Sequence, residues 1–213
     1  DDENAEKNAN ASTLKSRITW TSASYHGFSG LLEVDDVSHI GGENYATPSN
    51  GKVGEYPIVA DPDGTDINQV YLKYQQDGFT GTAGRQRILH SGQRFIGGVG
   101  WRQNEQTYDA FSVGNTSIPG LSAFYANISN VNRIVGEQSA AGDHTQDTNL
   151  LNVGYEFAGI GKLSAYYYDI DNKDNAALAN ETMGVRFAGA TDLDALKIAY
   201  ELEWADQEET GDG

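Results

Sequence analysis

The chain has 213 residues, of which 31 are acidic and 14 basic, so its formal net charge is −17. This balance excludes nucleic acid as a partner, because phosphate binding needs a basic surface. Cysteine is absent, which leaves neither a disulfide framework nor a thiolate metal site. The 12 tyrosines and 25 glycines separate the chain from disordered acidic sequences, which are poor in aromatic residues, so we expect it to fold.

Hydrophobic and polar residues alternate with a period of two along most of the chain. In "TLKSRITW", Leu14, Ile18 and Trp20 fall on one face, and Lys15 and Arg17 fall on the other. Such alternation predicts strands with one apolar and one polar face. In chain order the predicted strands are 12–25, 28–37, 66–75, 79–88, 108–114, 121–130, 149–157, 162–169, 181–188 and 195–204.

The connections between these strands alternate strictly in length. Short ones, such as "YHGF", "QQDGF" and "AGIGK", carry the Gly, Asp and Asn that hairpin turns need. The long ones are polar and cover 38–65, 89–107, 131–148 and 170–180. Short turns at one end and long loops at the other are typical of outer-membrane barrels. We therefore predict an all-β fold, a transmembrane antiparallel up-and-down β-barrel over residues 12–204. The acidic segments 1–11 and 205–213 are interpreted as polar tails or cut extracellular loops.

The barrel interpretation decides where the charged strand residues point. A Lys or Arg that faces lipid at mid-bilayer costs about 2–4 kcal/mol. Lys15, Arg17 and Lys73 lie mid-strand on the polar side, so we expect them to line the lumen.

Arginines are concentrated in one stretch. Four of the seven, Arg85, Arg87, Arg94 and Arg102, lie within "GRQRILHSGQRFIGGVGWR". The alternation predicts that Arg85 and Arg87 share a face of the strand at 79–88, about 7 Å apart along it. One interpretation is a structural ion-pair network with acids such as Glu105 and Asp109. The other is a selectivity element, because confined arginines attract anions and grip carboxylates.

Several segments carry a resemblance to a known family. "RITWTSASYHGFSGLLEVDDV", "YPIVADPDGTDINQVYLKY", "GRQRILHSGQRFIGGVGWRQNEQTYDAF" and "NVNRIVG" resemble the alginate export family of outer-membrane porins, over roughly residues 11–170. The resemblance implies a Gram-negative β-barrel with lumen arginines that contact uronate carboxylates. Carried over residue by residue, it indicates Arg85, Arg87, Arg102 and Arg133. Members of the family form larger barrels, so ten strands are expected to be part of one.

Metal-binding patterns in the sequence are incomplete. "DPDGTD" places Asp61, Asp63 and Asp66 at the spacing of a calcium loop, but the bidentate Glu that should follow is missing. These three residues are calcium candidates, with ordinary loop turns as the alternative. The four histidines are scattered without an i, i+2 or i, i+4 pair, so no zinc site and no cofactor are expected.

The sequence predicts a channel and no enzyme. We expect a passive porin in the outer membrane, with the lipid bilayer and a small hydrophilic or anionic saccharide as its partners. The alternative is a soluble extracellular β-sheet module whose long loops bind carbohydrate.

Overall fold

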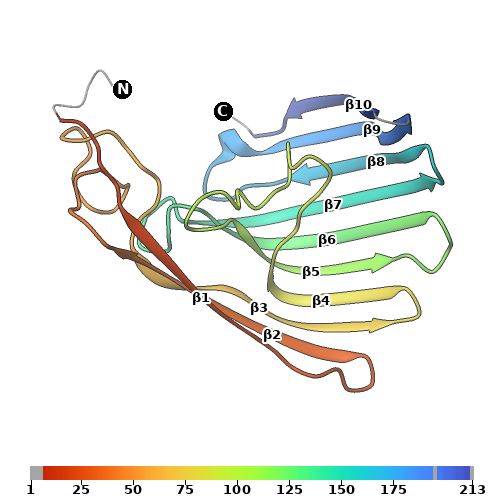
Figure 1. The fold of residues 1–213 in the computed structure, drawn as a ribbon, viewed down its shortest axis with the longest axis horizontal. Coiled ribbons are helices and arrows are strands. Elements are labelled where there is room, and N and C mark those ends of the chain that lie inside the picture. The colour runs from red at the N-terminus through yellow and green to blue at the C-terminus, as the bar shows by residue number, and fades with distance from the viewer. Residues whose placement is uncertain (1–6, 194–195, 212–213) are drawn as a thin grey trace.

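A computed structural model describes residues 7–193 and 196–211. They form one antiparallel sheet in which each strand pairs with its neighbours in sequence (Figure 1). The strands are β1 (Thr13–Thr21), β2 (Phe28–His39), β3 (Gly64–Gln76), β4 (Phe79–Gln86), β5 (Thr107–Asn115), β6 (Leu121–Asn132), β7 (Asp143–Phe157), β8 (Gly161–Ile170), β9 (Asn180–Leu193) and β10 (Leu196–Glu209). A short 3-10 helix, η1 (Ala176–Leu178), precedes β9. The predicted all-β, up-and-down antiparallel arrangement of ten strands is confirmed.

The connections sort by length onto opposite ends of the sheet. Tight turns lie at one end and the long loops at the other, as Figure 1 shows. Between β3 and β4 the turn is only Asp77 and Gly78, with φ of 50° and 82°. Two successive positive φ values match the right-handed twist of the strands, which is why a hairpin places Asp-Gly here. The predicted sorting of turns and loops is therefore confirmed.

The outer face of the sheet is a continuous apolar surface. Large apolar side chains from strands across the sheet lie on this face and are each 46–76 % exposed: Ile18, Trp20, Leu72, Phe111, Leu151, Met183, Leu202 and Trp204. Nothing in the described chain covers them. An apolar face of this extent suits hydrocarbon, whereas soluble monomers rarely expose such patches.

The inner face carries the loop between β4 and β5, which crosses the concave side of the sheet (Figure 1). Ile88 and Ile96 of this loop pack in a hydrophobic cluster with Ile128, Leu150 and Tyr168 of the wall. An inward loop needs such a cluster because its own backbone gains few ladder hydrogen bonds. The polar inner face predicted from the alternation is thus interrupted on β5 to β8, where apolar side chains hold the loop.

Some strand boundaries differ from the predicted ones. β1 ends at Thr21 instead of 25, and β10 continues to Glu209, into the segment predicted as a tail. β7 begins at Asp143, six residues before its predicted start. There His144, Gln146 and Thr148 alternate as buried polar residues, a pattern without the apolar signal that marks a strand. The predicted tail residues 1–6 and 212–213, and position 195 of the last predicted strand, lie outside the described residues.

Within residues 7–193 and 196–211, no helix combines the length and the apolar character needed to cross a membrane. β1 and β10 are the two edges of the sheet, and these two strands are not paired with each other.

Candidate functional site

Two basic residues of β1 face two carboxylates of β2. The register pairs Arg17 with Asp35, so their side chains share the inner face. Arg17 donates to both Asp35 oxygens, Nε to Oδ1 at 2.6 Å and Nη2 to Oδ2 at 2.7 Å. Lys15 Nζ lies 3.0 Å from Asp35 Oδ2, and Thr19 donates to Glu33 at 2.7 Å. Lys15 and Arg17, which were expected to line the lumen, thus lie in a row of charges on one face of the sheet.

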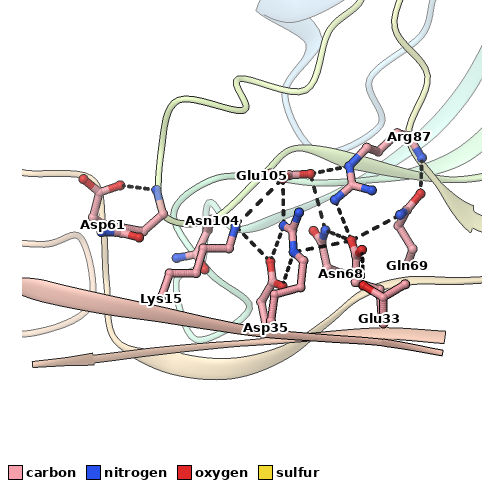
Figure 2. Close-up of polar contacts among 12 residues, drawn as sticks. Lys15, Glu33, Asp35, Asp61, Asn68, Gln69, Arg87, Asn104 and Glu105 are labelled. Atoms are coloured by element: carbon pink, nitrogen blue, oxygen red, sulfur yellow. Dashed lines mark hydrogen bonds and ion pairs between the residues drawn. The ribbon is translucent and has the colours of Figure 1, made fainter.

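The inward loop adds Arg87 and Glu105 to this row (Figure 2). Arg87 Nη2 lies 2.5 Å from Glu33 Oε1, and Arg87 Nε donates to Glu105. Arg17 Nη2 donates to the other Glu105 oxygen at 2.7 Å. Burial opposes ionisation of Glu105, but the hydrogen bonds from Arg87 and Arg17 outweigh it and lower its pKa to about 2. Glu105 is therefore ionised and bridges the loop to the wall.

We call Lys15, Arg17, Arg87, Glu33, Asp35 and Glu105 the charged cluster. Its three cations and three carboxylates balance each other. Two further hydrogen bonds surround the cluster (Figure 2). Asn68 donates to Glu33 at 2.7 Å, and the backbone N–H of Arg87 donates to the Gln69 side chain at 3.1 Å. This is the arrangement that the ion-pair interpretation of the arginines predicts.

Arg85 does not belong to the charged cluster. Its register row runs through Val70, Leu32 and Asp109, and Val70 and Leu32 are exposed on the outer face. Arg85 pairs with Asp109 at 2.8 Å and with Glu137 of the β6–β7 loop at 2.8 Å. The prediction that one strand carries both Arg85 and Arg87 is wrong, because β4 ends at Gln86. Arg85 lines a cavity with Asp35 and Glu105 of the charged cluster but makes its ion pairs elsewhere.

Two further arginines of the loop also have acidic partners. Arg102 lies 3.3 Å from Asp61 and stacks over Trp101, with 4.2 Å between the guanidinium carbon and the ring centroid. Arg94, which is 69 % exposed, lies 3.7 Å from Glu203 of β10. Arg102 thus anchors the loop to the β2–β3 loop.

Arg133 is different from the other arginines. Among the described residues it is the one arginine without a carboxylate oxygen within 4.0 Å. Its Nη1 donates to the Ala141 carbonyl at 3.2 Å and lies 3.4 Å from His144 Nε2. It lines a cavity of about 300 Å³ between the inward loop and the inner face of β6 to β8. Apolar and polar side chains share this lining, among them Phe95, Ile128, Ile170, His144, Gln146 and Asn172.

The remaining predicted site residues lie apart from one another. Lys73 is on the inner face opposite Thr82, and no carboxylate of the described chain is within 4.0 Å of it. The calcium candidates do not converge: Asp61 accepts from the Gln103 N–H at 3.0 Å, Asp63 lies near His39, and Asp66 is a partner of Asp35 in the β2–β3 register.

Sequence reasoning missed the residues that hold the loop in place. His90 packs edge-on against Phe124 and is stacked over Tyr168, with centroids 4.6 and 6.1 Å away. Burial lowers the pKa of His90 to about 4, with a smaller effect from Lys162, so the imidazole is neutral near pH 7. Tyr108 donates to the Gly97 carbonyl at 2.8 Å. The sequence signal that could have revealed this contact is the pair Tyr166 and Tyr168, two large side chains on a face otherwise expected to be polar.

The up-and-down sheet, its apolar outer face and its inward loop define a wall of an outer-membrane β-barrel of porin type. The sequence model for alginate export matches residues 16–211, and the chain belongs to this family. The resemblance, the outer-membrane location and the barrel fold predicted from the sequence are thereby confirmed, and the soluble module is excluded. A comparison with curated protein sequences finds no match.

Solved structures with this fold are outer-membrane porins. OccAB4 of Acinetobacter baumannii has a TM-score of 0.75 at 12 % identity, over 95 % of this chain and 54 % of its own. A BenF-like porin from Pseudomonas fluorescens Pf-5 has a TM-score of 0.70 at 14 % identity, over 95 % and 52 %. OpdK of Pseudomonas aeruginosa, solved with vanillate, has a TM-score of 0.68 at 11 % identity, over 93 % and 52 %. The chain spans about half the length of these porins.

Proposed function

We propose that the chain forms part of a passive outer-membrane channel for small hydrophilic solutes, including uronate-type anions, and that Arg133 is the anion contact. No covalent chemistry is involved: the barrel wall encloses water, the inward loop narrows the passage, and charge selects the solute. The proposal rests mainly on Arg133, whose guanidinium has no acidic partner among the described residues.

The charged cluster is a less suitable anion site. Its cations already have carboxylates at 2.5–3.0 Å, so an incoming anion would have to displace them. Arg133 instead has N–H donors without a carboxylate partner beside a cavity lined by both apolar and polar side chains. A planar guanidinium can bind a carboxylate in a bidentate way, while the apolar side chains of the lining can receive the ring of the solute. Vanillate, found with OpdK, is likewise a ring with a carboxylate.

Current measurements in planar bilayers test the proposal. The protein is reconstituted in a salt gradient, and the reversal potential and the block of current by galacturonate are recorded. Arg133→Ala should shift the reversal potential toward cation preference and weaken the block about tenfold or more, because the bidentate contact is lost. Arg133→Lys should keep the charge and restore part of the anion preference.

A matched control removes the same charge elsewhere. Lys7→Gln removes a positive charge from an exposed pair with Glu55, outside the lining of the Arg133 cavity, so reversal potential and block should stay as in the parent protein. Absence of any conductance would refute the channel itself. Conductance with an unchanged reversal potential and block in Arg133→Ala would refute the role of Arg133 alone.

A further inference from the structure

At the end of β2, where the β2–β3 loop begins, an imidazole and two carboxylates come together. The ligand atoms of His39, Glu43 and Asp63 lie within 4.8 Å of one another, the one such group of three among the described residues. His39 Nδ1 and Asp63 Oδ2 are 4.0 Å apart. None of these residues takes part in the charged cluster or in the Arg133 cavity.

The His39 ring is held so that one nitrogen is free for a ligand. Tyr45 is fully buried, and its hydroxyl donates to the Asp61 carbonyl at 3.2 Å. While the hydroxyl donates there, its oxygen can accept from His39 Nε2, 2.7 Å away, in the tautomer that protonates Nε2. Nδ1 then presents its lone pair on the side of Asp63. Metal-binding histidines are commonly oriented in this way by a hydrogen bond at the other nitrogen.

The carboxylates of Glu43 and Asp63 place negative charge beside Nδ1, which a divalent cation would neutralise.

The scaffold around the three side chains is already ordered by strands. His39 is the last residue of β2 and pairs with Thr13 of β1, and Asp63 directly precedes β3. Glu43 lies next to Asn44, whose carbonyl accepts from the Asn10 N–H at 2.7 Å. Zinc ligands lie about 2.0–2.2 Å from the ion, so ligand atoms now up to 4.8 Å apart must approach by about 1 Å. The Asp63 side chain is 57 % exposed and can make that movement.

We propose that His39, Glu43 and Asp63 bind a divalent first-row transition ion, which ties the two ends of the β2–β3 loop together. Imidazole favours ions such as zinc over calcium and magnesium, which prefer oxygen ligands throughout. Lys52, 2.9 Å from Glu43 Oε2, neutralises this carboxylate without the ion and competes with it.

Zinc binding to the purified protein in detergent, after treatment with a chelator, tests this site. Competition with a chromophoric zinc indicator should show one site per chain. His39→Ala and Asp63→Asn should weaken zinc binding at least tenfold. Lys52→Gln should strengthen it, because Glu43 is released. Tyr45→Phe keeps the packing but loses the oxygen that orients His39, so it should weaken binding about tenfold.

His26 provides a control at the opposite end of the sheet. It lies in the β1–β2 turn with a φ of 49°, which asparagine also tolerates, so His26→Asn should leave zinc affinity unchanged. Circular dichroism shows whether each variant has kept its strands. The proposal is overturned if no zinc binds to the folded protein, or if His39→Ala binds zinc as tightly as the parent.

Discussion

Glu105 is the residue on which the charged cluster depends most, because it receives both Arg17 and Arg87. Its pKa in the folded protein, about 2, lies below the value near 4.3 of an unfolded chain. The stability that this carboxylate contributes is therefore fully present above pH 4.3 and is lost as the pH falls toward 2. We predict that resistance to unfolding by urea drops over this interval.

Glu105→Gln should be less stable than the parent at neutral pH and should show a smaller loss between pH 4.3 and 2. Glu55→Gln is the control, because Glu55 is an exposed loop carboxylate paired with Lys7. Equal pH profiles for the parent and Glu105→Gln, measured by tryptophan fluorescence, would contradict this role of Glu105.

For single residues, the sequence predicted the acidic partners of the arginines correctly and the placement of two arginines incorrectly. Glu105 and Asp109 were predicted as the acids that compensate the arginines, and they are. The separation of Arg85 from Arg87 could not be predicted. Alternation assumes that a strand continues, and nothing in "GRQR" shows that β4 ends between the two arginines.

At the level of elements, the inward loop between β4 and β5 is fixed by side chains that the alternation pattern ignores. Tyr108 donates to the Gly97 carbonyl and accepts from Gln106, both at 2.8 Å. Tyr108→Phe should loosen the loop and destabilise it by about 1–2 kcal/mol, since the buried Gly97 carbonyl loses the shorter of its two hydrogen bonds. Single-channel recordings should then show larger current fluctuations, and the amides near Gly97 should exchange hydrogen faster.

Tyr125→Phe is the matched control for this change. The Tyr125 hydroxyl donates to Asn149 at 2.8 Å on the exposed outer face, away from the loop. It should leave current noise and the exchange near Gly97 as they are. Equal noise in both variants would show that Tyr108 does not hold the loop.

The ten strands were predictable because each has an apolar face, and the loops because their lengths alternate. Where a strand lacks that face, prediction failed, as in the first six residues of β7. The direction in which a long loop folds could not be predicted from the sequence either. It depends on contacts such as His90 with Tyr168, between residues far apart in sequence.

For the whole molecule, an introduced charge should cost unequal amounts of stability at two adjacent residues of one strand. Val153 of β7 lies on the apolar outer face, 38 % exposed, and Asn152 points inward, where its amide lies 3.4 Å from the Tyr168 hydroxyl. Val153→Arg should lower the free energy of unfolding in lipid bilayers by about 2–4 kcal/mol, because the guanidinium meets hydrocarbon. Asn152→Arg should cost less than half of that. Equal losses would argue against a lipid-facing outer surface.

The central claim is that the outer face touches hydrocarbon while the inner face encloses the loop and water. The three tryptophans report on it directly: Trp20 of β1 and Trp204 of β10 are on the outer face, and Trp101 is in the inward loop. Single-tryptophan variants in bilayers of brominated lipids measure contact with acyl chains. We predict strong quenching of Trp20 and Trp204, and little quenching of Trp101, which aqueous iodide should reach instead. Equal quenching of all three by brominated lipid, or none for Trp20 and Trp204, would contradict the account.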